Sequence, residues 1–224
     1  MTTKEVVKSN ENDTTKYLNL FSDVKVIDYN NIDQKFIEKL AKSLLSKYVL
    51  VVGKKEYRLG EIEFYINNAK HNDKYTHGDK NQKTYGKWYF HRYQNGSYKS
   101  GTYKGVDLTL GNDDTYFGVL IRSIYDPDTD EMVEGPCRTV NTILELYGYF
   151  DVSDYMKTKK DPLSARLTKN FYLKRKSKLE EEIVYKGPRI GLSDKYPEWK
   201  DVPYRFLIKK AYIKKGKSNL VQVQ

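Results

Sequence analysis

The chain has 224 residues, with 40 Lys and Arg against 30 Asp and Glu, which gives a formal charge of +10. This length suits one sizeable hydrophobic core and is short for two full domains, so we expect a single domain. No apolar run approaches the roughly 18 residues that cross a bilayer, and the first 20 residues lack the apolar centre of a secretory signal. We therefore expect an intracellular protein, cytoplasmic or nuclear, with no membrane partner.

The composition also limits the chemistry. Cys137 is the only cysteine, so neither an intramolecular disulfide nor a cysteine-based zinc site can form within the chain. The excess of positive charge favours an anionic partner, and 21 tyrosines supply flat rings that can stack on bases. Nucleic acid fits both features. The alternative is a lysine-rich proteome, which raises the lysine content of every protein.

Residues 1–22 are polar and show no periodicity, which predicts a flexible tail. An amphipathic helix of about four turns follows, because apolar residues recur at helical spacing from Phe36 to Tyr48 behind the cap candidates Asn31 and Asp33. Residues 48–52 then read as a short buried strand that ends at Gly53 and turns back into a second strand.

That second strand, residues 57–65, carries carboxylates in place of plain surface polarity. Side chains alternate between the faces of a strand, so Glu61 and Glu63 point to one face and Ile62 and Phe64 to the other. Two interpretations are open: an ordinary antiparallel strand with one solvated face, or a strand that brings two acids into a site.

Residues 66–86 form a loop rich in Asn, Asp, Lys and His. The loop holds His71 and His77, both close in sequence to the acidic strand. A zinc site made of His71, His77 and Glu63 is the metal-binding alternative, but this spacing matches no compact metal motif. We expect no metal and no cofactor.

Residues 85–104 contain no acid and interleave aromatic with basic side chains. Basic groups can hold phosphates while aromatic rings stack on bases or wedge between them. Lys99, Tyr103 and Lys104 are therefore candidate contacts for nucleic acid on an exposed hairpin. The alternative is an ordinary basic hairpin whose aromatic rings pack beneath it.

Two central strands follow at residues 106–110 and 117–122. Arg122 ends the second of these, which is almost wholly apolar. A guanidinium there is costly unless it meets a carboxylate, a phosphate or a ligand. Arg122 is thus either a site residue or half of a structural ion pair.

Gly135 and Pro136 open a helix that Gly148 ends, and a helix start preceded by glycine can receive a phosphate. Residues 157–178 carry nine basic residues against one acid, Asp161. This run, which includes Lys174, Arg175 and Lys176, is either an electrostatic footprint for DNA or a solvated loop. Residues 182–185 and 204–208 read as the last strands, and the basic segment 214–224 as a loose tail.

The order of these motifs resembles the alkyladenine (3-methyladenine) DNA glycosylase superfamily over residues 36–213. The motifs that carry the resemblance are Glu61-Ile62-Glu63-Phe64-Tyr65, His77, Tyr98 to Gly105, Val119-Leu120-Ile121-Arg122, Gly135-Pro136-Cys137-Arg138, Pro188-Arg189-Ile190-Gly191 and Pro203-Tyr204-Arg205-Phe206. The resemblance implies one α+β domain over residues 23–213, with a curved, mainly antiparallel sheet or partial barrel flanked by helices. It also implies a monomer that acts on double-stranded DNA.

The resemblance further implies roles for individual residues. Glu63 would be the general base that prepares water, and Arg122 would hold the nucleotide near it. Tyr65 and His77 would stack on the extruded base, with Glu61 and Tyr103 as further substrate contacts.

Two positions depart from the family pattern. Lys104 stands where the family has a wedging tyrosine before the hairpin glycine, with Tyr103 one position earlier. The nearest match to the asparagine that checks the purine edge is Asn112. These departures put the choice of base in doubt more than the type of reaction.

The function expected from this pattern is a monofunctional DNA glycosylase, which flips a modified or damaged base out of the duplex and leaves an abasic site. The many lysines leave a subsequent lyase step open. The alternatives are a glycosylase that acts on a hypermodified base, for example of a phage, in defence, and a non-catalytic nucleic-acid-binding module on the same scaffold. A small-molecule or RNA-acting relative is a third interpretation.

Overall fold

The computed structural model describes residues 27–159, 163–165 and 170–224. The tail expected over residues 1–22 lies outside the described residues. Within those ranges the chain forms four α-helices and three short 3₁₀ turns. Their bounds are α2 (Gln34–Lys47), α3 (Pro136–Glu145), α4 (Val152–Lys157), α5 (Pro197–Lys200), η1 (Lys80–Lys83), η2 (Gly101–Tyr103) and η3 (Lys210–Tyr212).

The described strands join into one sheet in which every strand pair is antiparallel. The strands are β1 (Tyr48–Val52), β2 (Lys55–Asn67), β3 (Tyr85–Phe90), β4 (Val106–Leu110), β5 (Tyr116–Asp126), β6 (Glu131–Glu134), β7 (Leu163–Ser164), β8 (Phe171–Arg175), β9 (Tyr185–Gly187), β10 (Arg205–Leu207) and β11 (Val221–Gln222). The main path runs β11-β9-β10-β2-β5-β4-β3-β7, and β8 joins β2 through β1. The expectation of an α+β fold with an antiparallel sheet is confirmed.

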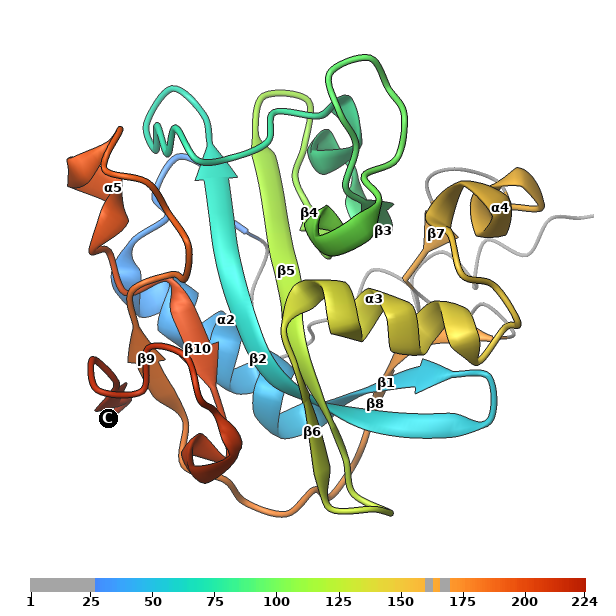
Figure 1. Ribbon diagram of the computed structural model, residues 1–224. Coiled ribbons are helices and arrows are strands. Elements are labelled where there is room, and N and C mark those ends of the chain that lie inside the picture. Colours follow the sequence, from blue (N-terminus) through green and yellow to red (C-terminus); the bar gives the residue numbers. More distant parts are fainter. Residues whose placement is uncertain (1–26, 160–162, 166–169) are drawn as a thin grey trace, which may run out of the picture.

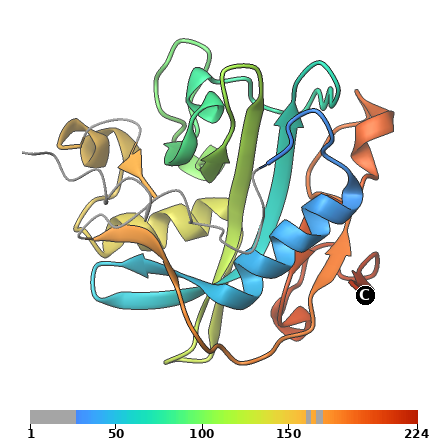
Figure 2. The ribbon, with the colours of Figure 1, turned by 180° about the vertical axis from the view of Figure 1, so that it is seen from behind.

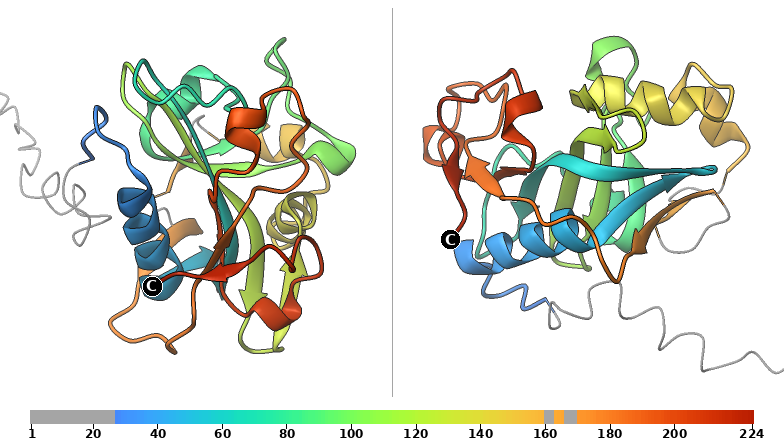
Figure 3. Two further views of the ribbon diagram at one scale, coloured as in Figure 1. Left: turned by 90° about the vertical axis from the view of Figure 1, so that its left-hand side faces the viewer. Right: turned by 90° about the horizontal axis from the view of Figure 1, so that it is seen from below.

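Two helices pack on opposite sides of this sheet. Figure 1 shows α3 in front of β5, and Figure 2 shows α2 crossing β2 on the rear side. The sheet runs between α2 and α3 in the left view of Figure 3. Phe64 and Phe206 meet edge to face at 5.6 Å within the core. The long central strands β2 and β5 are therefore the frame on which any site must be built.

The helix ends follow the sequence signals. Asp33 caps α2, since its carboxylate accepts the N–H of Phe36 at 2.7 Å. Gly135 precedes α3 with φ 107°, and Pro136 occupies the first turn, where its missing N–H has no helical acceptor. Gly148 follows α3 with φ 75°, a left-handed conformation that glycine adopts without strain.

Three segments differ from the expectation. Residues 157–178, for which a solvated loop was one of two interpretations, contain the end of α4 and strands β7 and β8. The strand expected at 182–185 begins only at Tyr185. Residues 214–224, expected as a loose tail, belong to the folded domain, because β11 pairs with β9 and the apolar side chains of Leu220 and Val223 are buried. Burial of these side chains stabilises a segment whose basic residues suggested solvation.

Candidate active site

Glu61, Glu63 and Tyr65 alternate along β2, and the side chains of both acids are fully buried. Arg122 comes from the neighbouring strand β5. Its Nε lies 3.0 Å from Oε1 of Glu61 and 3.6 Å from Oε1 of Glu63. The register between β2 and β5 is irregular at this point, where Glu61 matches Ser123. Such irregularities redirect side chains and are common beside functional sites.

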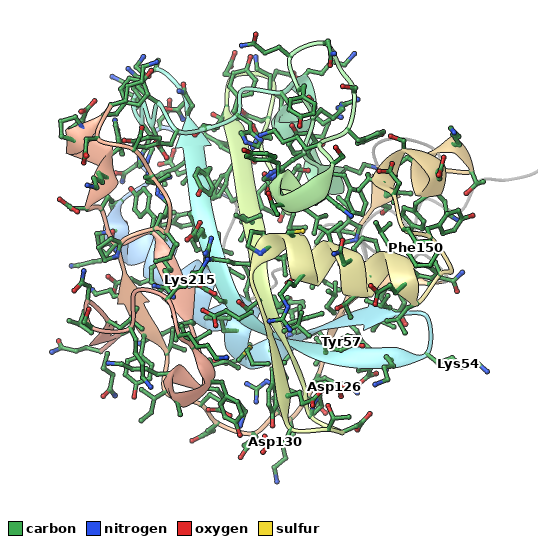
Figure 4. All side chains as sticks on the ribbon, viewed as in Figure 1. Lys54, Tyr57, Asp126, Asp130, Phe150 and Lys215 are labelled. Carbon is green, nitrogen blue, oxygen red and sulfur yellow. The ribbon has the colours of Figure 1, made fainter. Side chains whose placement is uncertain are left out.

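Glu61 is engaged on both of its oxygens. Ser123 donates its hydroxyl to Oε2 at 2.6 Å, and Arg205 donates Nε–H to Oε1 at 2.5 Å. Arg205 is itself 1% exposed and donates its remaining nitrogens to the carbonyls of Lys215 and Gly216. Lys215 lies beside β2 in Figure 4. Glu61 therefore joins the sheet to the C-terminal segment, a structural role within the site.

Glu63 also accepts a hydrogen bond on each of its oxygens, over slightly longer distances than Glu61 does. Ile190 donates its backbone N–H to Oε1 at 2.8 Å, and Tyr65 donates its hydroxyl to Oε2 at 2.9 Å. Burial raises the pKa of the Glu63 carboxyl above its ordinary value, although Arg122 and the Ile190 N–H act to lower it. Burial and the neighbouring Glu63 also raise the pKa of Tyr65, so that its phenol stays protonated as a donor. A carboxyl tuned upward in this way is typical of a general base.

The Nε atom of Arg122 lies within ion-pair distance of both acids. Its N–H is directed at neither carboxylate, so it forms no hydrogen bond with them. It is 7% exposed, whereas both acids are fully buried. Arg122 is therefore held by charge and is slightly more accessible than either acid. This arrangement suits a cation that meets an anionic ligand.

A buried arginine holds the segment that reaches Glu63. Arg189 forms a bidentate pair with Asp73, at 2.5 and 3.3 Å, and donates to the carbonyl of Phe64 at 3.0 Å. Its guanidinium also lies over the ring of Tyr65, at 4.6 Å from the centroid. Because Ile190 is the next residue, this cluster fixes the N–H that Glu63 accepts.

His77 does not join the acids directly. Its ring meets that of His91 edge to face at 4.2 Å, and Lys99 donates to its Nε2 at 3.3 Å. The residue keeps an exposed edge, yet burial of the rest of the ring and the neighbouring His91 lower the pKa of His77 to about 3. Lysine only donates, so Nε2 accepts and the proton of neutral His77 sits on Nδ1.

The zinc alternative finds no support in this geometry. His71 packs between Trp199 and Tyr204, at 4.9 and 5.6 Å between ring centroids, whereas His77 lies against His91. Across residues 27–159, 163–165 and 170–224, no group of three or more His, Cys, Asp or Glu is placed to hold a metal ion.

Tyr103 and Lys104 lie at the η2 turn. Tyr103 is 70% exposed. The ammonium of Lys104 donates to Oδ1 of Asn141 at 2.7 Å and to the carbonyl of Phe150 at 3.2 Å. Phe150, which is 84% exposed, lies beyond the C-terminal end of α3 in Figure 4. Lys104 thus follows the exposed Tyr103 in the chain and contacts the backbone of the exposed Phe150, and both of its acceptors are uncharged.

The basic residues of β8 are engaged differently. Lys174 and Lys176 both contact the carboxylate of Glu56, at 2.9 and 2.5 Å. Arg175 lies between them and is the last residue of β8, so Lys176 follows the strand. This pairing lowers the positive charge that β8 offers to an anion.

Two hollows lie apart from the acids. Asn112, the nearest match to the edge-checking asparagine, bridges to Thr115 and lines a pocket of about 520 Å³ with Tyr29 and Asn68. A groove of about 890 Å³ runs between α2 and the segments 181–184 and 222–224. Neither hollow is lined by Glu63 or Arg122.

Several residues in or near the centre were not singled out as site residues from the sequence, namely Asp73, Ser123, Arg189 and Arg205, and the same holds for His91 and Asp107, which pair with each other. Asp107 carries the clearest signal, since it is a carboxylate within the wholly buried strand β4. A buried acid requires partners, and these come from segments that the sequence alone does not bring together.

Fold and site together define a single-domain α+β protein with a buried centre of carboxylates and guanidinium groups on its sheet. The chain is 44% identical over 209 residues to "Uncharacterized protein L759" of Acanthamoeba polyphaga mimivirus, a match that covers 88% of this chain and 96% of the viral protein. It therefore belongs to the family of that mimivirus protein. No family model matches the sequence. None of the helices in the described ranges is long and apolar enough to cross a membrane.

Proposed function

We propose that this protein is a DNA glycosylase, which rotates a modified or damaged base out of duplex DNA and hydrolyses its N-glycosidic bond. The observation that supports this best is the buried pair of Glu63 and Arg122, in which burial raises the pKa of the carboxyl and a cation stands beside it. Hydrolysis needs a carboxylate that orients water and tolerates positive charge at the sugar. Glu63 has the chemistry for both tasks.

In the proposed mechanism, Arg122 holds the nucleotide through a phosphate or sugar oxygen, because its guanidinium is a cation that stands beside both acids without a hydrogen bond from Nε. Tyr65 and Ile190 keep the Glu63 carboxylate in place. Glu63 then accepts a proton from water as oxygen adds to C1′. No lysine contacts this carboxylate in the described part of the chain, which favours a monofunctional hydrolase over a lyase.

A non-catalytic nucleic-acid-binding module on this scaffold is the second candidate. The observation that favours it is the complete burial of Glu63 in the free protein. A nucleotide reaches this carboxylate only if covering groups such as Tyr65 move aside. As a glycosylase, the protein would act either in the repair of damaged DNA or in defence against foreign DNA that carries hypermodified bases. The base that it releases distinguishes these two roles.

The test is to incubate alkylated, deaminated and hypermodified duplexes with the protein and to treat them with alkali. Strand breaks, with a free base identified by mass spectrometry, support the glycosylase; retention of the duplex without breaks supports the binding module. Glu63→Gln should keep DNA affinity and lose excision by about 10²–10⁴-fold or more, because the amide keeps the shape but accepts no proton. Glu131→Gln, at an exposed position on β6, is the matched control.

A further inference from the structure

A run of lysines lies near the C-terminus, apart from the basic residues discussed so far. Residues 209–217 hold five lysines and no acid. We call residues 214–217 the C-terminal strap; its three lysines, Lys214, Lys215 and Lys217, are all exposed. The strap therefore offers positive charge to the solvent at three of its four positions.

A carboxylate holds the backbone of the strap and leaves its ammonium groups unpaired. Glu134, the last residue of β6, accepts the N–H of Lys214 at 3.2 Å and the N–H of Lys215 at 3.0 Å. Within residues 27–159, 163–165 and 170–224, none of the three ammonium groups of the strap forms an ion pair. The ammonium of Lys217 donates to the carbonyl of Ala211 at 3.4 Å. The strap is thus fixed in place without being neutralised.

One buried arginine joins the strap to Glu61. Arg205 donates Nε–H to Glu61, and it donates its terminal nitrogens to the carbonyls of Lys215, at 2.8 Å, and Gly216, at 3.1 Å. Figure 4 shows Lys215 beside β2, the strand that carries both acids. A single guanidinium therefore holds the strap backbone against the centre.

Gly216 joins the strap to the neighbourhood of Glu63 as well. A Cβ on Gly216 would lie 2.5 Å from Cδ1 of Ile190, whose backbone N–H donates to Glu63. The φ of Gly216 is 59°, a left-handed conformation that glycine adopts without strain. The close approach that this glycine permits packs the strap against the segment that holds the proposed general base.

Unpaired ammonium groups on a fixed backbone suit the phosphates of a nucleic acid. Each lysine that meets a phosphate releases counterions from the nucleic acid, which favours binding. Because the backbone is already held, binding orders only the lysine side chains and costs less conformational entropy. Lys209, five residues before the strap, pairs with Glu182 at 2.8 Å and offers less charge. A nucleotide that approaches Glu63 brings its neighbouring phosphates toward the strap, since the strap packs against the residues that hold this acid.

We infer that the C-terminal strap is a phosphate-binding element that seats the DNA backbone beside the two acids, an inference that deepens the proposed function and rests on duplex DNA being the partner. Lys214, Lys215 and Lys217 supply the charge, while Glu134 and Arg205 hold the backbone that carries them. Binding through this surface is independent of sequence, because its contacts go to phosphates and not to base edges.

The first test measures the charge of the strap in the full chain. A fluorescent, undamaged duplex is titrated with protein over a range of salt concentrations. Lys215→Gln should lower the slope of log affinity against log salt by about 0.9, the value of one phosphate contact, and joint replacement of the three strap lysines should lower it further. Lys54→Gln is the matched control, because Lys54 is exposed and lies well away from Lys215 in Figure 4; it should leave the slope unchanged.

The second test separates the anchoring of the strap from its charge. Glu134→Ala removes a negative charge, which on electrostatic grounds alone should strengthen binding of the duplex. The same change removes the acceptor of two strap N–H groups, so we expect binding to weaken several-fold instead. Glu131→Ala, at an exposed position on the same strand, removes the same charge without touching the strap and should not weaken binding. Melting temperatures show that each variant is folded.

The outcomes separate this inference from the proposed function. If the triple lysine variant keeps the affinity and slope of the parent, or if Glu134→Ala binds the duplex more tightly than the parent, the inference is wrong while the glycosylase stands. If the strap variants weaken binding as expected but the parent releases no base from any duplex, the strap stands and the glycosylase fails. A parent that binds no duplex overturns both.

Discussion

The phenol of Tyr65 donates a 2.9 Å hydrogen bond to the carboxylate of Glu63, two residues earlier on the same strand. This bond favours the ionised carboxylate and lowers its pKa, against the opposing effect of burial. The hydroxyl thus tunes the group proposed as the general base while the ring covers it.

Tyr65→Phe should therefore shift the activity profile toward higher pH. Without the hydrogen bond the pKa of Glu63 rises further. Because a general base acts in its deprotonated form, the acid limb of the activity profile then moves to higher pH. The loss of a hydrogen bond to a charged group should lower the free energy of unfolding by about 1–3 kcal/mol. The measurement is a pH–rate profile of base release, with Tyr93→Phe as control; an acid limb identical to that of the parent would contradict the assignment.

The stability of Glu63→Gln should depend on pH in a defined direction. Burial raises the pKa of Glu63 above its value of 4.5 in the unfolded chain. The contribution of this carboxyl to folding is thus complete below that value and is lost as the pH rises through the folded-state pKa. The amide resembles the protonated acid at every pH. The melting temperature of Glu63→Gln should therefore rise relative to that of the parent as the pH goes from acid to neutral. A difference that stays constant with pH would show that the pKa of Glu63 is not raised by folding.

Glu61→Gln should act on folding more than on chemistry. The carboxylate is fully buried and carries Arg205 and Arg122, which would remain as buried cations. Removing one partner of a buried ion pair costs about 3–5 kcal/mol. Urea unfolding of the variant beside Glu63→Gln checks this, and excision is measured well below the melting temperature of both. A loss of activity in a fully folded Glu61→Gln equal to that in Glu63→Gln would mean that the roles of the two acids are not separate.

How much of the fold and the site could be predicted from the sequence depends on how far apart the interacting residues lie along the chain. The face shared by Glu61 and Glu63 follows from the alternation of a strand, and Asp33 as the cap of α2 follows from local hydrogen bonding. The sequence predicts that Arg122 is either a site residue or half of a structural ion pair. It does not predict that Arg122 lies beside both acids, because strand pairing is not a local property. Its approach to the acids fits either interpretation.

The residues that sequence reasoning missed are joined over long separations. Arg189 meets Asp73 across 116 residues, and Arg205 meets Glu61 across 144. No periodicity reports such pairs. The prediction of a loose C-terminal tail was wrong for a related reason. Its lysines indicated solvation, whereas Leu220 and Val223 find their contacts only once β9 and β10 are in place.

The pair of Arg189 and Asp73 should behave as a coupled unit. Arg189→Met leaves the Asp73 carboxylate buried without its partner and should cost about 3–5 kcal/mol of unfolding free energy. Adding Asp73→Asn should recover part of that loss, since the uncompensated charge is gone. A double-mutant cycle by urea unfolding measures the coupling. Strict additivity of the two substitutions would show that each acts through other contacts.

The basic candidates should differ in how they bind DNA. Lys104 has only uncharged acceptors and lies close to the exposed residues Tyr103 and Phe150, so its charge is available to a phosphate. Lys104→Gln should lower the slope of log affinity against log salt by about 0.9, the value of one phosphate contact. Glu56 already neutralises part of the charge of Lys174 and Lys176, so replacing both by Gln should change the slope by less.

Titration of a fluorescent duplex over a range of salt concentrations measures these slopes for both variants. Glu56→Gln is the companion variant, because it frees Lys174 and Lys176 without removing them. If it steepens the slope, or if the double lysine variant flattens the slope more than Lys104→Gln does, the DNA lies along β8 and the η2 turn is not the main contact. A slope that responds only to Lys104 places the duplex against Tyr103 and Phe150.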